Sequence, residues 1–413
     1  MSYLKNKIIN DPIYGFINIP FDLIWQLIEH PFFQRLRRIS QLGLSSLVYP
    51  GAIHSRFHHA IGAMHLMNKA IHTLKAKGHI ITKEEHEASL IAILLHDIGH
   101  GPFSHALENS IVNNLPHEKI STLFMYQLND IFNQKLSMAI DIFQKKYKKN
   151  YLNQLVSSQL DVDRLDYLNR DSFYSGVNEG IINSDRIISM LNIHNNELVI
   201  DYKGLYSIEK FIIARKLMYW QVYLHKTVLS AEHTLMQVLK RAKELVQNDI
   251  YIYSTPSFKL FLYEKKLINL TLFNEKNLLE KFALIDDADI LTCIKHWTQS
   301  EDQVLNILSN SIINRKLLKI KSIDKKNMNK KIQEIKNKAI KSLNLNEIDA
   351  SYLVFPISIK NQTYNFIDDE IKFLKKNNVL VNLSEIKNEI NMNTKNSRIT
   401  KHYICYPKGI WEK

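Results

Sequence analysis

Cysteine is scarce in this sequence: only Cys293 and Cys405 occur among 413 residues. Two cysteines cannot build a disulfide framework or a cysteine metal site, so we expect a protein of the reducing cytoplasm. Long apolar runs are also missing, since Leu90–Leu95 and its neighbours fall far short of the roughly 20 residues of a membrane span. The first residues, MSYLKNKIINDP, lack the apolar core of a signal peptide. We therefore expect no membrane partner.

Acidic residues are outnumbered, with 41 Asp and Glu against 54 Lys and Arg, for a net charge of +13. Much of the excess lies in residues 315–341, where 11 Lys and Arg face only Asp324 and Glu334. One interpretation is a solvated helix or loop in a lysine-rich protein. The other is a surface for weak binding of nucleic acid or nucleotides.

Glycine and proline are absent from Leu205 to Val246, which predicts one long helix or two. Apolar residues also recur at helical spacing over 60–77, and Thr82-x-x-Glu85 is a capping box for a helix running to about Asp97. After Tyr352 strand-forming residues dominate, as in YLVFPISI, NVLVNL and HYICYP.

These patterns predict a mainly α fold, with a helical core and a smaller mixed α/β C-terminal region. No internal repeat is visible, and the length favours more than one core or one large helical body with an appendage. We expect an N-terminal turn and helix over residues 1–45 and a helical core over 46–300. A basic linker and the α/β region would occupy 301–413.

Histidine is the strongest chemical signal, because 11 of the 17 histidines lie between His54 and His117. The stretch LLHDIGHGPFSHALE places His96-Asp97 where a helix meets Gly99 and Gly101. Neighbouring helical residues point about 100° apart, so this pair can share one ion only near a helix end. Imidazole and carboxylate together suit Fe, Mn, Ni, Zn or Mg without choosing among them. Further ligands must come from elsewhere, and RFHH and LDVDRLDYLNRD offer them.

The set His59, His96-Asp97 and Asp163 matches the H…HD…D signature of the HD-domain phosphohydrolases. The ordered strings NDPIYG, FQRLRRISQLG, RFHHAIG, HDIGHGPFSH and DVDRLDYLNRD resemble the dNTP triphosphohydrolase branch over roughly residues 7 to 240. The resemblance implies a helical HD core in which these four residues hold one divalent metal. It also implies hydrolysis of a dNTP to deoxynucleoside and inorganic triphosphate, with Mg²⁺ as a companion ion of the triphosphate.

The resemblance assigns further roles by position. Candidate catalytic residues are His105, His117 and Glu108. Candidate substrate-binding residues are Gln41, Leu42, Arg56, His100, Arg164, Tyr167, Asp171, Arg215, Tyr219 and Tyr223. Tyr223 would pack under the sugar and disfavour a 2′-hydroxyl. The alternative is that Arg215, Tyr219 and Tyr223, which share one helical face, are simply a packing face of large side chains.

Several members of the branch are nucleotide-activated oligomers, so the resemblance implies a homo-oligomer, dimer or tetramer, with an activator site. Matching positions are Lys7, Asn10, Gln34, Arg37, Arg186, His225 and Lys226. Glu29 stands where the branch has an aspartate that reads guanine, which leaves the activating base open. Alternatively, FQRLRR is a basic helix at a dimer interface.

Two other functions compete with dNTP hydrolysis. One is another HD phosphohydrolase activity, on nucleotide monophosphates, cyclic nucleotides or alarmones. The other is a nucleic-acid-binding protein with a vestigial metal site, which residues 315–341 would serve. The intact ligand set argues against the second, because a purely binding protein does not need it.

Overall fold

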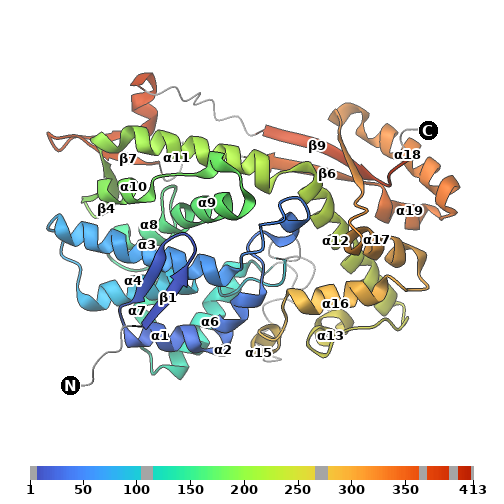
Figure 1. The fold of residues 1–413 in the computed structure, drawn as a ribbon, viewed down its shortest axis with the longest axis horizontal. Coiled ribbons are helices and arrows are strands. Elements are labelled where there is room, and N and C mark those ends of the chain that lie inside the picture. The colour runs from blue at the N-terminus through green and yellow to red at the C-terminus, as the bar shows by residue number, and fades with distance from the viewer. Residues whose placement is uncertain (1–6, 104–114, 266–277, 362–369, 390–398, 411–413) are drawn as a thin grey trace.

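The computed structural model describes residues 7–103, 115–265, 278–361, 370–389 and 399–410 of the chain (Figure 1). Helices make up most of it, and the strands form small sheets, so the predicted mainly α class with a mixed α/β C-terminal region is confirmed.

The N-terminal segment begins with a hairpin of β1 (Lys7–Asp11) and β2 (Gly15–Ile19), which are antiparallel. The turn between them is the NDPIYG sequence, and Gly15 adopts a positive φ of 70° that favours glycine. Two short helices follow, α1 (Asp22–Glu29) and α2 (Pro31–Gln34). A 3-10 turn then carries the basic residues Arg35–Arg38.

The helical core contains the histidine-rich segments. Its helices are α3 (Arg56–Ala76), α4 (Lys83–Leu95), α6 (His117–Ile131), α7 (Ser137–Phe143), α8 (Asn150–Val156), α9 (Val162–Ser175) and α10 (Ser184–Met190). The predicted capping box opens α4, since Thr82 and Glu85 each bond the other's backbone N–H. The helix ends at Leu95, slightly before the predicted Asp97, and His96 is its C-cap.

The segment without glycine or proline forms two helices, α11 (Leu205–Met218) and α12 (Lys226–Gln247). A π-helical turn, Tyr219–Tyr223, separates them. His225 is the N-cap of α12 and accepts a hydrogen bond from the Thr227 backbone N–H. The break therefore lies at the predicted substrate-binding tyrosines rather than at a helix-breaking residue.

The remaining elements are mostly C-terminal. The helices are α13 (Pro256–Tyr263), α15 (Leu278–Phe282), α16 (Asp287–Trp297), α17 (Gln303–Ile313), α18 (Met328–Leu343) and α19 (Glu347–Leu353). The strands are β3 (Leu191–His194), β4 (Glu197–Asp201), β5 (Lys319–Ser322), β6 (Phe355–Asn361), β7 (Lys372–Leu374), β8 (Leu380–Asn382) and β9 (Ile399–Tyr406).

Two sheets organise these strands. One has the order β5-β9-β6 and packs against α18, whose Ile335 and Ala339 are buried. The basic segment thus contributes a strand and an amphipathic helix. The other sheet, β3-β4-β7-β8, joins β7 in parallel to β4 of the core. Figure 1 shows the two sheets at different ends of the molecule.

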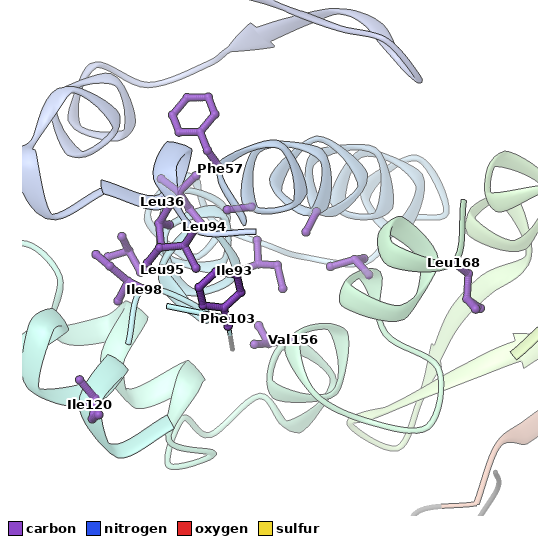
Figure 2. Close-up of a cluster of buried hydrophobic side chains, with 14 of the residues drawn as sticks. Leu36, Phe57, Ile93, Leu94, Leu95, Ile98, Phe103, Ile120, Val156 and Leu168 are labelled. Carbon is purple, nitrogen blue, oxygen red and sulfur yellow. The ribbon is translucent and has the colours of Figure 1, made fainter. Parts of the chain in front are cut away.

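A large hydrophobic core extends from Ile17 to Cys405 in the described residues, and a smaller cluster lies between α18 and the β5-β9-β6 sheet. Figure 2 shows the part of the large core around the C-terminal end of α4, where Leu94, Leu95 and Ile98 pack with Leu36 and Phe57. This packing fixes the point at which α4 ends, and therefore the position of His96 and Asp97.

Candidate metal and phosphate site

The four predicted metal ligands lie together, delivered by three helix ends. His59 is in the first turn of α3, His96 and Asp97 follow the end of α4, and Asp163 is in the first turn of α9. Asp163 Oδ1 is 3.1 Å from His59 Nε2 and 3.6 Å from His96 Nε2. Asp97 Oδ1 is 3.4 Å from His96 Nε2, and its Oδ2 is 3.9 Å from His59 Nε2.

The ring nitrogens of both histidines are arranged as in a metal site. His59 Nδ1 donates to the Asp166 carboxylate at 2.7 Å, and His96 Nδ1 donates to the Ile93 carbonyl at 2.6 Å. With the proton on Nδ1, the Nε2 atom of each histidine carries no proton, and its lone pair faces a carboxylate. Both Nε2 atoms are buried and form no hydrogen bond with any described residue. Converging acceptors of this kind fit a divalent cation between them.

The electrostatics of the cluster show the same attraction for positive charge. Burial lowers the pKa of His59, but contacts with Asp163 and Asp166 outweigh it and raise that pKa to about 10. Burial raises the pKa of Asp163, but His59 and His96 lower it further than burial raises it. A site that binds protons this strongly also attracts a metal ion, which competes with them.

The loop that carries His96 and Asp97 is held from two sides. Arg35, buried in the core, donates to the carbonyl oxygens of Ile98 at 2.7 Å and His100 at 2.6 Å. On the other side, a Cβ on Gly99 would lie 2.2 Å from the Ser121 backbone nitrogen. Glycine is needed here because α6 packs directly against the loop.

A second cluster contains Asp97 with two further histidines. His100 Nδ1 is 3.3 Å from Asp97 Oδ1, and the ring of His117, the first residue of α6, stacks on His100 with centroids 3.8 Å apart. Arg56 Nη1 donates to Asp97 Oδ2. The structure thus brings the predicted residues Arg56, His100 and His117 to the metal ligands. His105 and Glu108 lie outside the described residues.

Two of the predicted substrate-binding residues, Arg164 and Arg215, lie at the N-terminal end of α9, which carries Asp163. Arg164 follows it on α9 and is bound to Asp161, while Arg215 donates to Gln159 at 3.2 Å. The Nε atoms of both arginines are buried and bond no described residue. An unsatisfied guanidinium donor in a buried position fits an anion such as a phosphate.

The predicted sugar-binding side is a cluster of aromatic rings around Asp171. Tyr223 packs edge-on against Tyr167 and Tyr219, with centroids 6.1 Å and 5.2 Å away. Arg215 lies 5.9 Å from the Tyr219 ring. Asp171 is buried between His54 and Tyr223. The π-helical turn therefore still brings these residues together.

Gln41 and Leu42, which the resemblance assigns with Asp171 to the sugar and base, lie on the segment between two 3-10 turns, Arg35–Arg38 and Gly43–Leu47. The Gln41 backbone N–H donates to the His54 carbonyl at 3.0 Å. Gln41 is thereby joined to the residue that binds Asp171.

The predicted activator residues occupy several places. Lys7 lies over the Trp25 ring at 4.3 Å, and Asn10 is on β1. Gln34 accepts a bond from Arg37, whereas His225 packs edge-on against Tyr49. Figure 1 places β1 and the start of α12, with Lys226, in different parts of the molecule. Arg186 is exposed on α10.

Sequence reasoning missed several residues that support the site. They are Asp11, Arg35, His54, Asp161, Asp166 and Arg170, all buried. Asp166 and Arg170 follow Asp163 at intervals of three and four residues, and helical spacing could have placed them near one another. Arg35 gave no signal, since a buried arginine in a basic run resembles its exposed neighbours.

Comparison with known proteins agrees with this geometry. Residues 56–171 match the HD domain family, and residues 182–255 match the HD associated region. The protein YwfO of Bacillus subtilis strain 168 is 31% identical, over 98% of this chain and 93% of its own length. The crystal structure of a phosphohydrolase from Bacteroides thetaiotaomicron VPI-5482 is 46% identical, with a TM-score of 0.93, over 98% of this chain and 100% of its own. The chain belongs to the HD-domain phosphohydrolase superfamily, and it is a metal-binding hydrolase by class.

A relative that matches a smaller part of the chain is the deoxynucleoside triphosphate triphosphohydrolase SAMHD1 homolog of Dictyostelium discoideum. It is 31% identical over 60% of this chain and 51% of its own length.

Among the described residues, no helix is both long and apolar enough to cross a membrane.

Proposed function

We propose that this protein is a dNTP triphosphohydrolase that converts a dNTP and water to a deoxynucleoside and inorganic triphosphate. The observation that carries the proposal is the position of the metal ligand Asp163 next to Arg164 on α9, with Arg215 bonded to Gln159 just before that helix. The buried Nε donors of both arginines are unsatisfied by described residues. A cation site next to free guanidinium donors suits a polyphosphate. The activity for which the Dictyostelium relative is named supports the same substrate class.

His59, His96, Asp97 and Asp163 would hold the divalent metal, which is Fe, Mn, Ni, Zn or Mg. When bound, such an ion lowers the pKa of a coordinated water and neutralises phosphate charge. A companion Mg²⁺ would enter with the triphosphate.

The surrounding cations would bind and orient the phosphates. Arg164 on α9 and Arg215 on α11 would bind phosphate oxygens, as would Arg56 and His100, which contact Asp97. Guanidinium groups offer two donors in a plane, which fixes a phosphate in position as well as in charge.

His117 would deliver a proton to the departing 5′-oxygen, with His105 as a second candidate and Glu108 orienting one of them. The position of His117 supports this role, because its ring stacks on His100 beside Asp97. Imidazole is suited to donate a proton near neutral pH.

The sugar would lie against Tyr223, which packs against Tyr219. Gln41, Leu42 and Asp171 would contact the sugar and base, and Tyr167 would contact the phosphates. An aromatic ring beneath C2′ leaves no space for the extra hydroxyl of a ribonucleotide.

We also propose that the protein forms a homo-oligomer whose activator site combines Lys7, Asn10, Gln34, Arg37, Arg186, His225 and Lys226.

Product analysis tests the proposal. Purified full-length protein is incubated with each dNTP and NTP in ¹⁸O-labelled water, with each of the five metals in turn. Attack of water at the α-phosphorus breaks the bond to the 5′-oxygen, so the label should appear in triphosphate and not in the deoxynucleoside. Pyrophosphate with a monophosphate, or stepwise release of single phosphates, would instead assign another HD phosphohydrolase chemistry.

A further inference from the structure

A row of buried charged residues runs from His59 to the N-terminal hairpin. Asp166 accepts the hydrogen bond of His59 Nδ1 at 2.7 Å. Arg170, one helical turn further along α9, binds both oxygens of Asp166, at 2.8 Å from Nε and 2.9 Å from Nη2. Both side chains are 0% exposed.

The row continues into the hairpin through Asp11, the last residue of β1. The third nitrogen of Arg170, Nη1, donates to Asp11 Oδ2 at 2.9 Å. Asp11 Oδ1 in turn accepts the backbone N–H groups of Ile13 at 2.9 Å and Tyr14 at 3.0 Å. Asp11 therefore closes the hairpin turn with one oxygen and binds Arg170 with the other.

Close packing of α3 against α9 leaves little freedom for this row. A Cβ on Gly62 would lie 2.1 Å from both Arg170 Nη2 and Asp166 Oδ1. Gly62 lies one turn beyond His59 on α3, so its missing side chain makes room for the pair beside the metal ligand. On the hairpin side, the Tyr14 ring lies 5.6 Å from the Arg170 guanidinium.

We infer that Asp166, Arg170 and Asp11 are positioning residues that fix the orientation and tautomer of His59, so that metal affinity depends on the hairpin turn. Asp166 can only accept, which keeps the proton on Nδ1 and leaves Nε2 for the metal. Arg170 holds both oxygens of Asp166, and Asp11 anchors Arg170. The described contacts connect Asp11 to His59 through these two residues. The inference rests on the metal site of the proposed function and is independent of the substrate.

The test is metal binding by the full-length protein without nucleotide. Co²⁺ is titrated against a competing chelator, and its visible absorption bands report the ligand geometry. Asp166→Asn should weaken Co²⁺ binding roughly 10- to 100-fold, the usual effect of losing such a partner, and shift the bands. Asp11→Asn should weaken binding roughly 3- to 10-fold by the same route, since its effect is passed through two contacts.

The matched control is Asp302→Asn. Asp302 also binds an arginine with both oxygens, Arg241 at 3.1 Å and 2.6 Å, and it also accepts a backbone N–H, that of Leu305. Asp302 is the N-cap of α17 and its partner Arg241 is on α12, so this pair joins two helices that carry none of the metal ligands. This variant should lose stability to urea but keep the wild-type Co²⁺ affinity and spectrum.

A double variant separates positioning from general destabilisation. In the Asp166→Asn background, Asp11→Asn should weaken Co²⁺ binding no further, because the route to His59 is already broken. If Asp166→Asn does not fold, Arg170→Lys replaces it, since lysine cannot bind both carboxylates in this geometry. Unchanged affinity in Asp11→Asn, additive losses, or an equal loss in Asp302→Asn would overturn the inference.

Failure of the inference differs from failure of the proposed function. A protein that binds Co²⁺ normally in every variant keeps its metal site but lacks the positioning effect. A wild-type protein that binds no Co²⁺ contradicts both. Absence of dNTP hydrolysis alone leaves the measured Co²⁺ affinities, and therefore the inference, unaffected.

Discussion

Tyr223 donates a hydrogen bond of 2.7 Å to Oδ2 of Asp171, across the gap between the π-helical turn and α9. His54 Nε2 lies 2.8 Å from the other oxygen of the same carboxylate. The Tyr223 ring is thereby fixed at its hydroxyl end, while its edge packs against Tyr167. A side chain held in this way can form a rigid wall for a sugar.

Replacing Tyr223 with Ala should reduce the preference for dNTPs over NTPs by roughly tenfold or more. Each factor of ten in this preference corresponds to about 1.4 kcal/mol. The reason is that the ring, and not the hydroxyl, excludes the 2′-oxygen. Tyr223→Phe, which keeps the ring, should retain most of the preference. The ratio of kcat/KM for dATP and ATP measures this, and an equal ratio in Tyr223→Ala and wild type would move discrimination to another group.

Replacing Asp97 with Ala should abolish both metal retention and hydrolysis while the protein stays helical. Asp97 contacts His96 and His59 as well as Arg56, so its loss opens the cluster and removes a carboxylate that Arg56 binds. Metal content by mass spectrometry and circular dichroism check this. Asp185→Ala, which removes an exposed partner of Lys69, should keep full metal content. Equal occupancy in both variants would show that the ligands are assigned wrongly.

Replacing Arg37 with Ala should remove activation by a second nucleotide and keep basal hydrolysis. The Arg37 guanidinium lies 3.6 Å from the centroid of the Phe57 ring. Phe57 is on α3, the helix that carries His59, so an activator bound at Arg37 could act on the metal site through α3. Arg38→Ala is the control, because Arg38 is on the same turn but binds Asp286. Initial rates in mixtures of two dNTPs, with light scattering for mass, provide the measurement. Hyperbolic kinetics and constant mass in wild type would contradict activation by assembly.

Glu232 should make the protein less stable as the pH rises. Burial raises the pKa of this α12 carboxyl from 4.5 to about 7, so in this window the folded protein keeps a proton that the unfolded chain releases. Its stabilising effect is complete below pH 4.5 and is lost as pH rises through about 7. Glu232 Oε1 lies 3.5 Å from the Cβ position of Gly43, in the turn that follows Leu42.

Glu232→Gln removes this titration, and the variant should exceed wild type in unfolding free energy above pH 7. The upper limit of this difference is about 3.5 kcal/mol, because each pKa unit corresponds to about 1.4 kcal/mol. Urea unfolding at about pH 5 and about pH 8 measures the difference. If the difference in unfolding free energy between the variant and wild type is the same at both pH values, Glu232 does not titrate in this range.

The sequence by itself determined the helical class, because apolar spacing and capping residues act locally. The Thr82–Glu85 box and the π-helical break show both the success and the limit of this reasoning. The box forms as predicted. The break at Tyr219–Tyr223 contains no glycine or proline, so nothing in the local sequence marks it.

Only the tertiary structure decided which side chains meet. The motif string named His59, Asp97 and Asp163, but the distances among them depend on three helix ends packed around a common core. Likewise β7 pairs with β4, from a segment some 170 residues earlier, through backbone hydrogen bonds that carry no sequence signature.

The supporting residues show the same division most clearly. Asp166 and Arg170 lie on one helical face, which their spacing dictates. Their contact with Asp11 and His59 exists because Gly62 lets α9 approach α3, and because the hairpin turn closes over them. Local spacing is encoded by the backbone geometry of one helix, whereas the burial that pairs these charges arises only when separate segments pack together.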